Sequence, residues 1–260
     1  MKPPRSFRTE AVVLKRSRLR EADSLLTLYT PRFGKIRAVA KGALRPKSKL
    51  RGHVEPLTYS QIQLTQGQDL DTVTQGETLE SFLPLRDDLL TTSYAIYVAE
   101  VTDRFTPDGE ANYSLFQLLV QTLRRLCQAH NDITLLMHFE LHLLEHLGYR
   151  PELYRCVNCD CPLTPTTNFF SIPDGGVVCP ACNQREQFLR PLSINALKVL
   201  RFLQGNDYLT TQRIHLSSEL SLDLQPLLHG YISYLLEREV KSMTWIDRLR
   251  ARDRLAGQQY

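Results

Sequence analysis

Hydrophobic residues in the first 80 positions recur at every second residue, in short runs separated by turn signals. This period is typical of β-strands that bury one face. The runs predict five strands, over residues 9–16, 24–30, 35–41, 57–65 and 72–79. Because the connections leave no room for helical crossovers, we expect antiparallel pairing in a small barrel.

From Leu85 onward the period of the apolar residues changes from two to that of a helix. We expect helices over 90–105, 115–126, 133–147, 194–203 and 224–239. Ser193 is a suitable N-cap for the fourth of them. The expected fold class is α+β, with a barrel domain over residues 1–80 and a helical domain over residues 81–260.

The charge is unevenly distributed along the chain. The protein has 260 residues, 42% of them hydrophobic, and a net charge of only +4. Residues 1–52 hold 15 basic and 3 acidic residues, whereas the remainder holds 17 basic and 25 acidic ones. This asymmetry favours a basic N-terminal module that binds a polyanion. No run of 18 apolar residues and no signal-peptide pattern occurs, so we expect a cytoplasmic, nucleoid-associated protein with no membrane contact.

The basic residues gather in a stretch without a carboxylate, residues 31–52. At period two, Lys35, Arg37 and Lys41 are expected to point to one side of their strand. Lys and Arg are almost never buried unpaired, so this surface faces either a negative partner or water. The five-stranded barrel most often used for oligonucleotides is the OB-fold, although that fold also serves other partners. The predicted nucleic-acid contacts are Lys35, Arg37, Lys41, Arg45, Lys47, Lys49 and Arg51.

Two aromatic residues, Tyr29 and Phe33, flank the basic strand and could stack on the bases of a single strand. Each also has a structural interpretation, one as a core aromatic of the barrel and the other as an anchor of the turn. No base-reading recognition helix is evident, so we expect binding without strong sequence preference.

Four cysteines form two pairs, Cys156-x2-Cys159 and Cys179-x2-Cys182, separated by nineteen residues. Two such turns can complete a tetrahedral site for one Zn²⁺, and four thiolates leave no position open for catalysis. We therefore predict a structural zinc in an irregular insertion at about 154–186. Cys161 could replace Cys159 as a ligand, but a free thiol is favoured because the paired spacing is complete without it. Disulfides are the alternative, disfavoured by a reducing cytosol.

The segment from His142 to His146, with Glu145, matches the H-x-x-E-H pattern of one group of zinc peptidases, and His138 lies one turn earlier. The helical period, however, predicts that the histidines lie on an outer face, opposite the apolar stripe of Ile133, Met137, Leu141 and Leu144. A peptidase would bury this motif in a cleft. The sequence also lacks a phosphate-binding glycine-rich loop and a nucleophile elbow, so we expect a protein that is not an enzyme.

With these residues placed, the chain resembles the RecO family of bacterial recombination mediators over nearly its whole length. The resemblance is carried by residues 9–14 (TEAVVL), 21–24 (EADS), 30–35 (TPRFGK), 40–43 (AKGA) with the basic loop, 147–151 (LGYRP), 235–238 (LLER) and 241–242 (KS). These patterns are loose singly, but their order and separation are specific.

The resemblance implies an N-terminal OB-fold, a helical domain and a zinc-finger-like insertion. Proteins of this kind bind single- and double-stranded DNA and anneal complementary strands. They act with RecR, and in some settings with RecF, to help RecA load onto DNA covered by single-stranded-DNA-binding protein, whose acidic C-terminal tail they also bind. Two other readings stay open: a generic OB-fold RNA- or DNA-binding protein with a structural zinc, and a metal-dependent hydrolase using the histidines.

Overall fold

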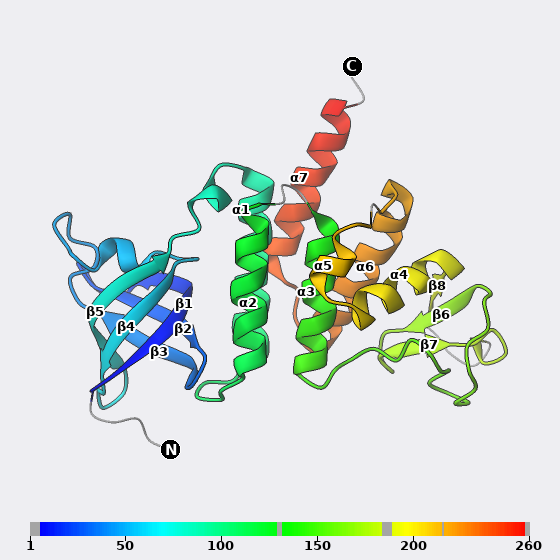
Figure 1. The fold of residues 1–260 in the computed structure, drawn as a ribbon, viewed down its shortest axis with the longest axis horizontal. Coiled ribbons are helices and arrows are strands. Elements are labelled where there is room, and N and C mark those ends of the chain that lie inside the picture. The colour runs from blue at the N-terminus through cyan, green and yellow to red at the C-terminus, as the bar shows by residue number, and fades with distance from the viewer. Residues whose placement is uncertain (1–5, 129–131, 184–188, 215, 258–260) are drawn as a thin grey trace. The chain divides into compact units, whose positions relative to one another are not determined.

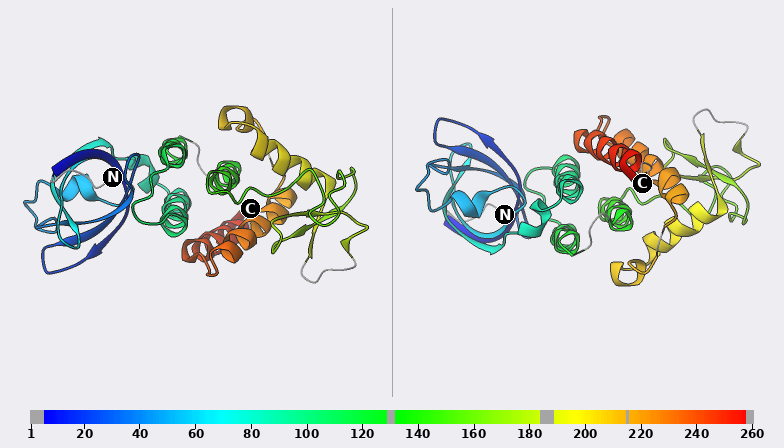
Figure 2. Two further views of the ribbon diagram at one scale, coloured as in Figure 1. Left: turned by 90° about the horizontal axis from the view of Figure 1, so that it is seen from below. Right: turned by 90° about the horizontal axis from the view of Figure 1, so that it is seen from above.

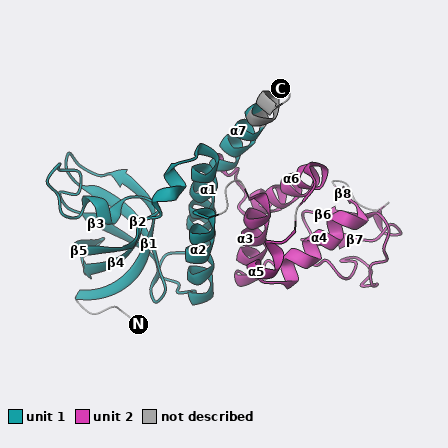
Figure 3. Ribbon diagram, turned by 45° about the horizontal axis from the view of Figure 1, so that its top comes forward, with its two compact units in different colours: residues 1–131, 242–260 teal, residues 132–241 magenta. Residues whose placement is uncertain are grey.

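A computed structural model describes residues 6–128, 132–183, 189–214 and 216–257 (Figure 1). The chain forms two compact units, residues 1–131 with 242–260, and residues 132–241 (Figure 3). The second unit is thus inserted into the sequence of the first. The boundary predicted at residue 80 falls inside the first unit, and the division into domains 1–80 and 81–260 stays a prediction.

The first unit begins with a closed five-stranded barrel in the order β1-β2-β3-β5-β4 (Figures 1 and 2). Its strands are β1 (Ser6–Arg18), β2 (Ser24–Thr30), β3 (Gly34–Ala40), β4 (Tyr59–Thr65) and β5 (Asp71–Glu80). All five predicted strands and the OB-type barrel are confirmed. The expectation of purely antiparallel pairing is wrong, because β3 and β5 pair in parallel. A closed ring with an odd number of strands cannot alternate direction throughout, so at least one neighbouring pair must be parallel.

The barrel core is built from the alternate residues that the sequence pattern selects. Leu26 of β2 pairs with Ala38 of β3, and these two residues point into the core together with Leu28 and Ala40; all four are fully buried. Burying a leucine side chain contributes roughly 1.5–3 kcal/mol, so these positions fix the register of the strands.

Helices α1 (Leu89–Phe105) and α2 (Tyr113–Leu126) follow the barrel and lie side by side (Figures 1 and 2). Each begins at a side-chain N-cap, Asp88 or Asn112, which accepts a hydrogen bond from a backbone N–H in the first turn. Two short 3₁₀ helices are also present: η1 (Arg51–Val54) lies between β3 and β4, and η2 (Leu83–Arg86) lies between β5 and α1.

The last helix, α7 (Lys241–Gly257), returns to the first unit. Its Ser242 donates two hydrogen bonds to the Glu100 carboxylate on α1, from the backbone N–H and from the hydroxyl. Two turns later, Arg250 donates to the Tyr94 hydroxyl at 2.8 Å and lies over the same ring. These contacts hold α7 along α1.

The second unit contains α3 (Ile133–His146), α4 (Ile194–Gly205), α5 (Tyr208–Thr211) and α6 (Ser218–Leu235). Ser193 caps α4 as predicted, accepting from the N–H of Ala196. Between α3 and α4 lies a three-stranded sheet in the order β7-β6-β8, formed by β6 (Asn168–Ser171), β7 (Gly176–Val178) and β8 (Leu189–Leu192). The sequence did not predict this sheet, and residues 184–186 of the expected insertion lie outside the described residues.

The small sheet is packed against the helices of its own unit. The Phe170 ring of β6 meets the Tyr231 ring of α6 at 5.7 Å, and the Tyr231 hydroxyl donates to the carbonyl of Tyr149. The Arg190 guanidinium of β8 donates to the carbonyl of Pro226 at 2.9 Å. The insertion is therefore an integral part of the second unit. No helix in the described ranges is both long and apolar enough to span a bilayer.

Candidate nucleic-acid interface and metal centre

The segment after β3 folds into an exposed cationic loop, which we call the basic loop (residues 41–51). Successive turns shape it: the N–H of Arg45 donates to the carbonyl of Gly42, and that of Ser48 to the carbonyl of Arg45. Gly42 has φ +66°, a conformation that disfavours residues with a Cβ. All its cations are exposed and make no ion pair with any other described residue: Lys41, Arg45, Lys47, Lys49 and Arg51.

The basic loop is held against the β1–β2 turn. The N–H of Leu44 donates to the carbonyl of Ala22 at 3.0 Å, and the N–H of Gly42 to the Asp23 carboxylate at 2.7 Å. These contacts bring the exposed Arg18 and Arg20 to the same end of the barrel. These two arginines belong to the same basic N-terminal stretch but are not among the contacts predicted from the sequence. Together, the loop and turn form an array of cations suited to phosphates.

Lys35 does not belong to this array. It is only 9% exposed, and its Nζ donates to the carbonyl of Asp103 at 2.6 Å and to its carboxylate at 3.2 Å. A second carboxylate, Asp108, lies 3.6 Å from the same Nζ and 3.5 Å from the Nε of Arg37. The prediction of an exposed Lys35 is wrong, because two acidic residues supplied by α1 and the segment after it neutralise the lysine. Arg37 stays exposed but shares Asp108.

The two aromatic candidates serve the structure of the barrel. Tyr29 is fully buried, its ring 6.3 Å from that of Phe116 on α2, and burial raises its pKa to about 12. Its ring therefore offers no face to a base. Phe33 is half-buried against Phe7 at 4.7 Å, and its N–H donates to the hydroxyl of Thr30. These are the core aromatic and the turn anchor that the sequence left open as alternatives.

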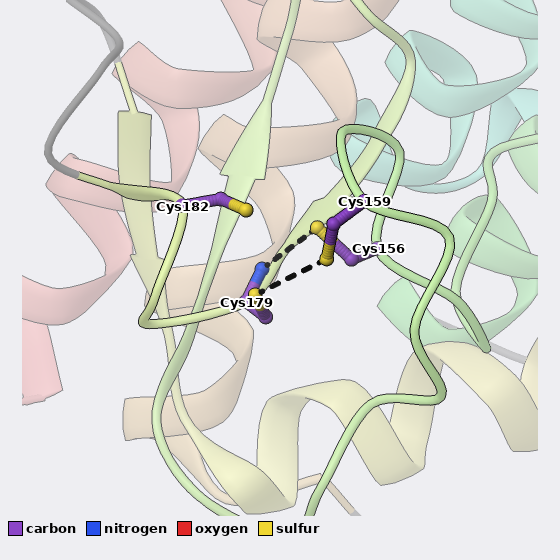
Figure 4. A group of neighbouring side chains, drawn as sticks. All are labelled: Cys156, Cys159, Cys179 and Cys182. Carbon is purple, nitrogen blue, oxygen red and sulfur yellow. Dashed lines mark hydrogen bonds between the residues drawn. The ribbon is translucent and has the colours of Figure 1, made fainter.

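The four predicted metal ligands lie together in the second unit. Figure 4 shows Cys156 and Cys159 on one loop facing Cys179 and Cys182 on another. Their sulfur atoms all lie within 4.8 Å of one another, and the Cys159 and Cys179 sulfurs are 3.8 Å apart. Tetrahedral Zn²⁺ with bonds of about 2.3 Å places its sulfur ligands about 3.8 Å apart. The donor set and its spacing thus fit one metal ion.

The backbone of the first cysteine turn organises its thiols. The N–H of Asp160 donates to the carbonyl of Cys156, and Asp160 adopts φ +57°, which closes the turn tightly after Cys159. Hydrogen bonds, first that from the backbone N–H of Cys161 and then those from the thiols of Cys161 and Cys156, lower the pKa of the Cys159 thiol to about 6, which favours the thiolate that a metal requires. The Cys161 sulfur lies 3.2 Å from that of Cys159, outside the group of four.

The histidines of α3 are placed differently from the prediction. His138 is 3% exposed and its ring lies 4.1 Å from that of His142. The Nε2 of His142 lies 3.2 Å from each of the carbonyl oxygens of Leu203 and Asn206. The predicted outer face is therefore wrong, because α4 and α5 cover α3 on that side as well. Among the described residues, only the cysteines form a group of three or more metal-capable side chains with converging ligand atoms.

Comparison with known proteins covers both compact units. Residues 1–82 match the family model described as the N-terminal part of recombination protein O, and residues 86–244 match the model of its C-terminal part. A protein of Dehalococcoides mccartyi named DNA repair protein RecO is 40% identical over 249 residues, 96% of this chain and 98% of that protein. A Roseiflexus protein of the same name is 40% identical over 247 residues, 95% of this chain and 87% of its own. A third, from Desulforamulus reducens, is 35% identical over 243 residues, 94% of each.

Proposed function

Because the chain belongs to the RecO family of DNA repair proteins, we propose that it acts as a recombination mediator that binds single- and double-stranded DNA and anneals complementary strands. The observation that carries this proposal is the basic loop, whose exposed cations stand beside Arg18 and Arg20 at one end of an OB-type barrel. The loop and turn are the proposed DNA contacts, with Arg37 at their margin; Lys35, Tyr29 and Phe33 have structural roles.

The proposed mechanism is electrostatic. Cations at the barrel end neutralise phosphates and release counterions, which lowers the repulsion between two strands that are to pair. This activity makes and breaks no covalent bond. With RecR, the protein would help RecA load onto DNA covered by single-stranded-DNA-binding protein, and a contact with the acidic tail of that covering protein would raise the local concentration of the mediator.

We further propose that Cys156, Cys159, Cys179 and Cys182 hold one structural Zn²⁺. When bound, the metal cross-links two loops of the second unit, and its four thiolate ligands leave no site for a reacting water. The chain itself supplies the rest: β6, β7 and β8 position the second cysteine pair, and the contacts with α6 hold the sheet to the helices.

The test is the annealing rate of complementary strands coated with the cognate covering protein, with its acidic tail present and deleted. Acceleration that depends on the tail supports the mediator function. Absence of acceleration with either form, despite tight DNA binding, would reduce the protein to a generic nucleic-acid-binding barrel. A preference for RNA over DNA in the same binding assay would favour that second function.

A further inference from the structure

A polar cavity of about 210 Å³ opens on the outside of the barrel, away from the basic loop. It lies between the start of β1, the β2–β3 turn and the middle of β4, and its lining residues are Arg8, Thr9, Glu10, Pro31, Arg32 and Gln61. Two guanidinium groups therefore share one small cavity with a carboxylate and a carboxamide. None of these residues is among the nucleic-acid contacts predicted from the sequence.

The strand registers place this cavity and the basic loop at opposite ends of one ladder. Ser24 pairs with Ala40 at the end from which the basic loop departs, and Thr30 pairs with Gly34 at the end of the turn that carries Arg32. Six residue steps at about 3.3 Å each separate the two ends by about 20 Å. On β1, Val12 lies between the cavity residues and the loop end, and it pairs with Tyr29 and Tyr59.

Helix α2 covers the part of the barrel surface around Val12, which lies between the cavity and the basic loop. Phe116 packs on the rings of both Tyr29 and Tyr59, at 6.3 and 6.0 Å. Val12 beneath them is fully buried. Along β1, β2 and β4, helical residues therefore lie between the basic loop and the cavity.

The acidic group in the cavity is held in place. The Tyr59 hydroxyl donates to one carboxylate oxygen of Glu10, and burial together with this hydrogen bond raises the pKa of Tyr59, so the phenol keeps its proton. Arg124 of α2 lies over the Tyr59 ring and is paired with Glu80 on β5. Glu10 is thus oriented by a network that reaches two other elements, and it lines the cavity.

The remaining groups match the two parts of a nucleotide. Arg32 is exposed, and the ion pair that Arg8 makes among the described residues is a solvent-exposed one with Glu77 at 3.0 Å, with side chains 60% and 70% exposed. Such a surface pair is worth little, so a phosphate can compete for the guanidinium. A carboxylate oxygen and the carboxamide of Gln61 can pair with the donors and acceptors on the edge of an unpaired base.

We propose that this cavity is a second binding site for a nucleic-acid strand, taking the phosphate of one nucleotide on Arg8 and Arg32 and its base edge on Glu10 and Gln61. The inference rests on the proposed DNA binding and extends it. With one strand at the basic loop and another at the cavity, a single barrel binds both partners of an annealing reaction. Because both strands are bound to the same protein, the local concentration of each near the other is raised.

The experiment measures how many three-nucleotide oligothymidylates one protein chain binds at low salt, by titration calorimetry, together with the annealing rate. At a duplex-like rise of 3.4 Å, three nucleotides extend about 10 Å, half the separation of the two sites, so each oligonucleotide occupies only one of them. Gln61→Trp fills the cavity without changing the charge, and Arg32→Gln removes an exposed cation from a turn. Gln75→Trp, on the exposed side of β5 and outside the cavity lining, is the matched control.

We expect Gln61→Trp and Arg32→Gln each to reduce the stoichiometry from about two oligonucleotides per chain to about one and to slow annealing several-fold, whereas Gln75→Trp leaves both unchanged. A basic-loop variant should likewise keep one site. If both cavity variants bind and anneal as the unmodified protein does, the inference is overturned while the proposed function stands. If the unmodified protein binds no oligonucleotide, the proposed function fails with it.

Discussion

Neutralising three cations of the basic loop should have a calculable effect on DNA binding. We consider Arg45→Gln, Lys47→Gln and Lys49→Gln together, because all three side chains are exposed and make no ion pair with any residue in the described part of the chain. No native interaction is lost, so the fold should be unaffected.

The magnitude follows from counterion release. Each phosphate contact on a single strand contributes about −0.7 to the slope of log K against log salt concentration. The five loop cations together account for about −3.5, and the triple variant should lose about 2.1 of this. At 0.1 M salt that loss corresponds to affinity weaker by about 100-fold. Contacts by Arg18 and Arg20 add to the absolute slope but cancel in the difference.

The assay is fluorescence anisotropy with a 20-nucleotide oligothymidylate over a range of salt concentrations. The matched control replaces Lys198, Arg213 and Arg238 by glutamine, which removes the same charge from exposed positions in the second unit. If the control changes the slope as much as the loop variant, net charge governs binding and the loop is not the site. An unchanged slope in the loop variant would refute the reasoning outright.

Three further predictions concern the framework of the site. Replacing Lys35 by Met should lower the free energy of unfolding, measured by urea denaturation, by about 1–2 kcal/mol, because the Asp103 carboxylate loses its ion pair and faces an apolar side chain. The salt slope of DNA binding, measured by anisotropy, should stay unchanged. An unchanged stability together with a reduced slope would contradict this prediction. Gly34→Ala should lower the free energy of unfolding by well over about 1 kcal/mol, because Gly34 has φ +61° and an added Cβ would overlap the Glu110 carbonyl. Gly109→Ala should lower it by only about 1 kcal/mol, because Gly109 has φ +81° but an added Cβ would meet no other atom. Equal melting temperatures of the two variants would contradict this prediction. Replacing any one of the four clustered cysteines by serine should abolish stoichiometric zinc in elemental analysis and lower the melting temperature of the second unit. The affinity for single-stranded DNA should change less than about twofold. Zinc retained at one ion per chain would show that the predicted ligand set is wrong.

The barrel could be predicted because its signals are local. Ser24–Thr30 alternates cleanly, and the turn at Pro31–Gly34 marks its end, so the strand was placed to the residue. The short strands β6 to β8 have three or four residues each, too few to establish a period. They form a sheet only because β8 reaches β6 from twenty residues further along the chain.

The sequence predicts the exposed cations of the candidate site, but it does not predict which side chains are paired with residues far away along the chain. The cations of the basic loop need no partner, and a carboxylate-free stretch identifies them. Lys35, in contrast, is decided by Asp103, 68 residues away, which no local pattern reveals. The faces of α3 were misjudged for a related reason: residues far along the sequence cover His138 and His142, so this helix has no outer side there.

The return of α7 to the first unit has a consequence for how the protein is made. Synthesis proceeds from the N-terminus, so the barrel, α1 and α2 leave the ribosome before the inserted unit and well before Ser242. Until then Glu100 has neither of the hydrogen bonds that Ser242 donates, and Tyr94 lacks Arg250. The barrel, α1 and α2 thus receive their contacts with α7 only after the inserted unit has been synthesised. A premature stop near residue 241 would leave the inserted unit whole and damage the helices that support the barrel.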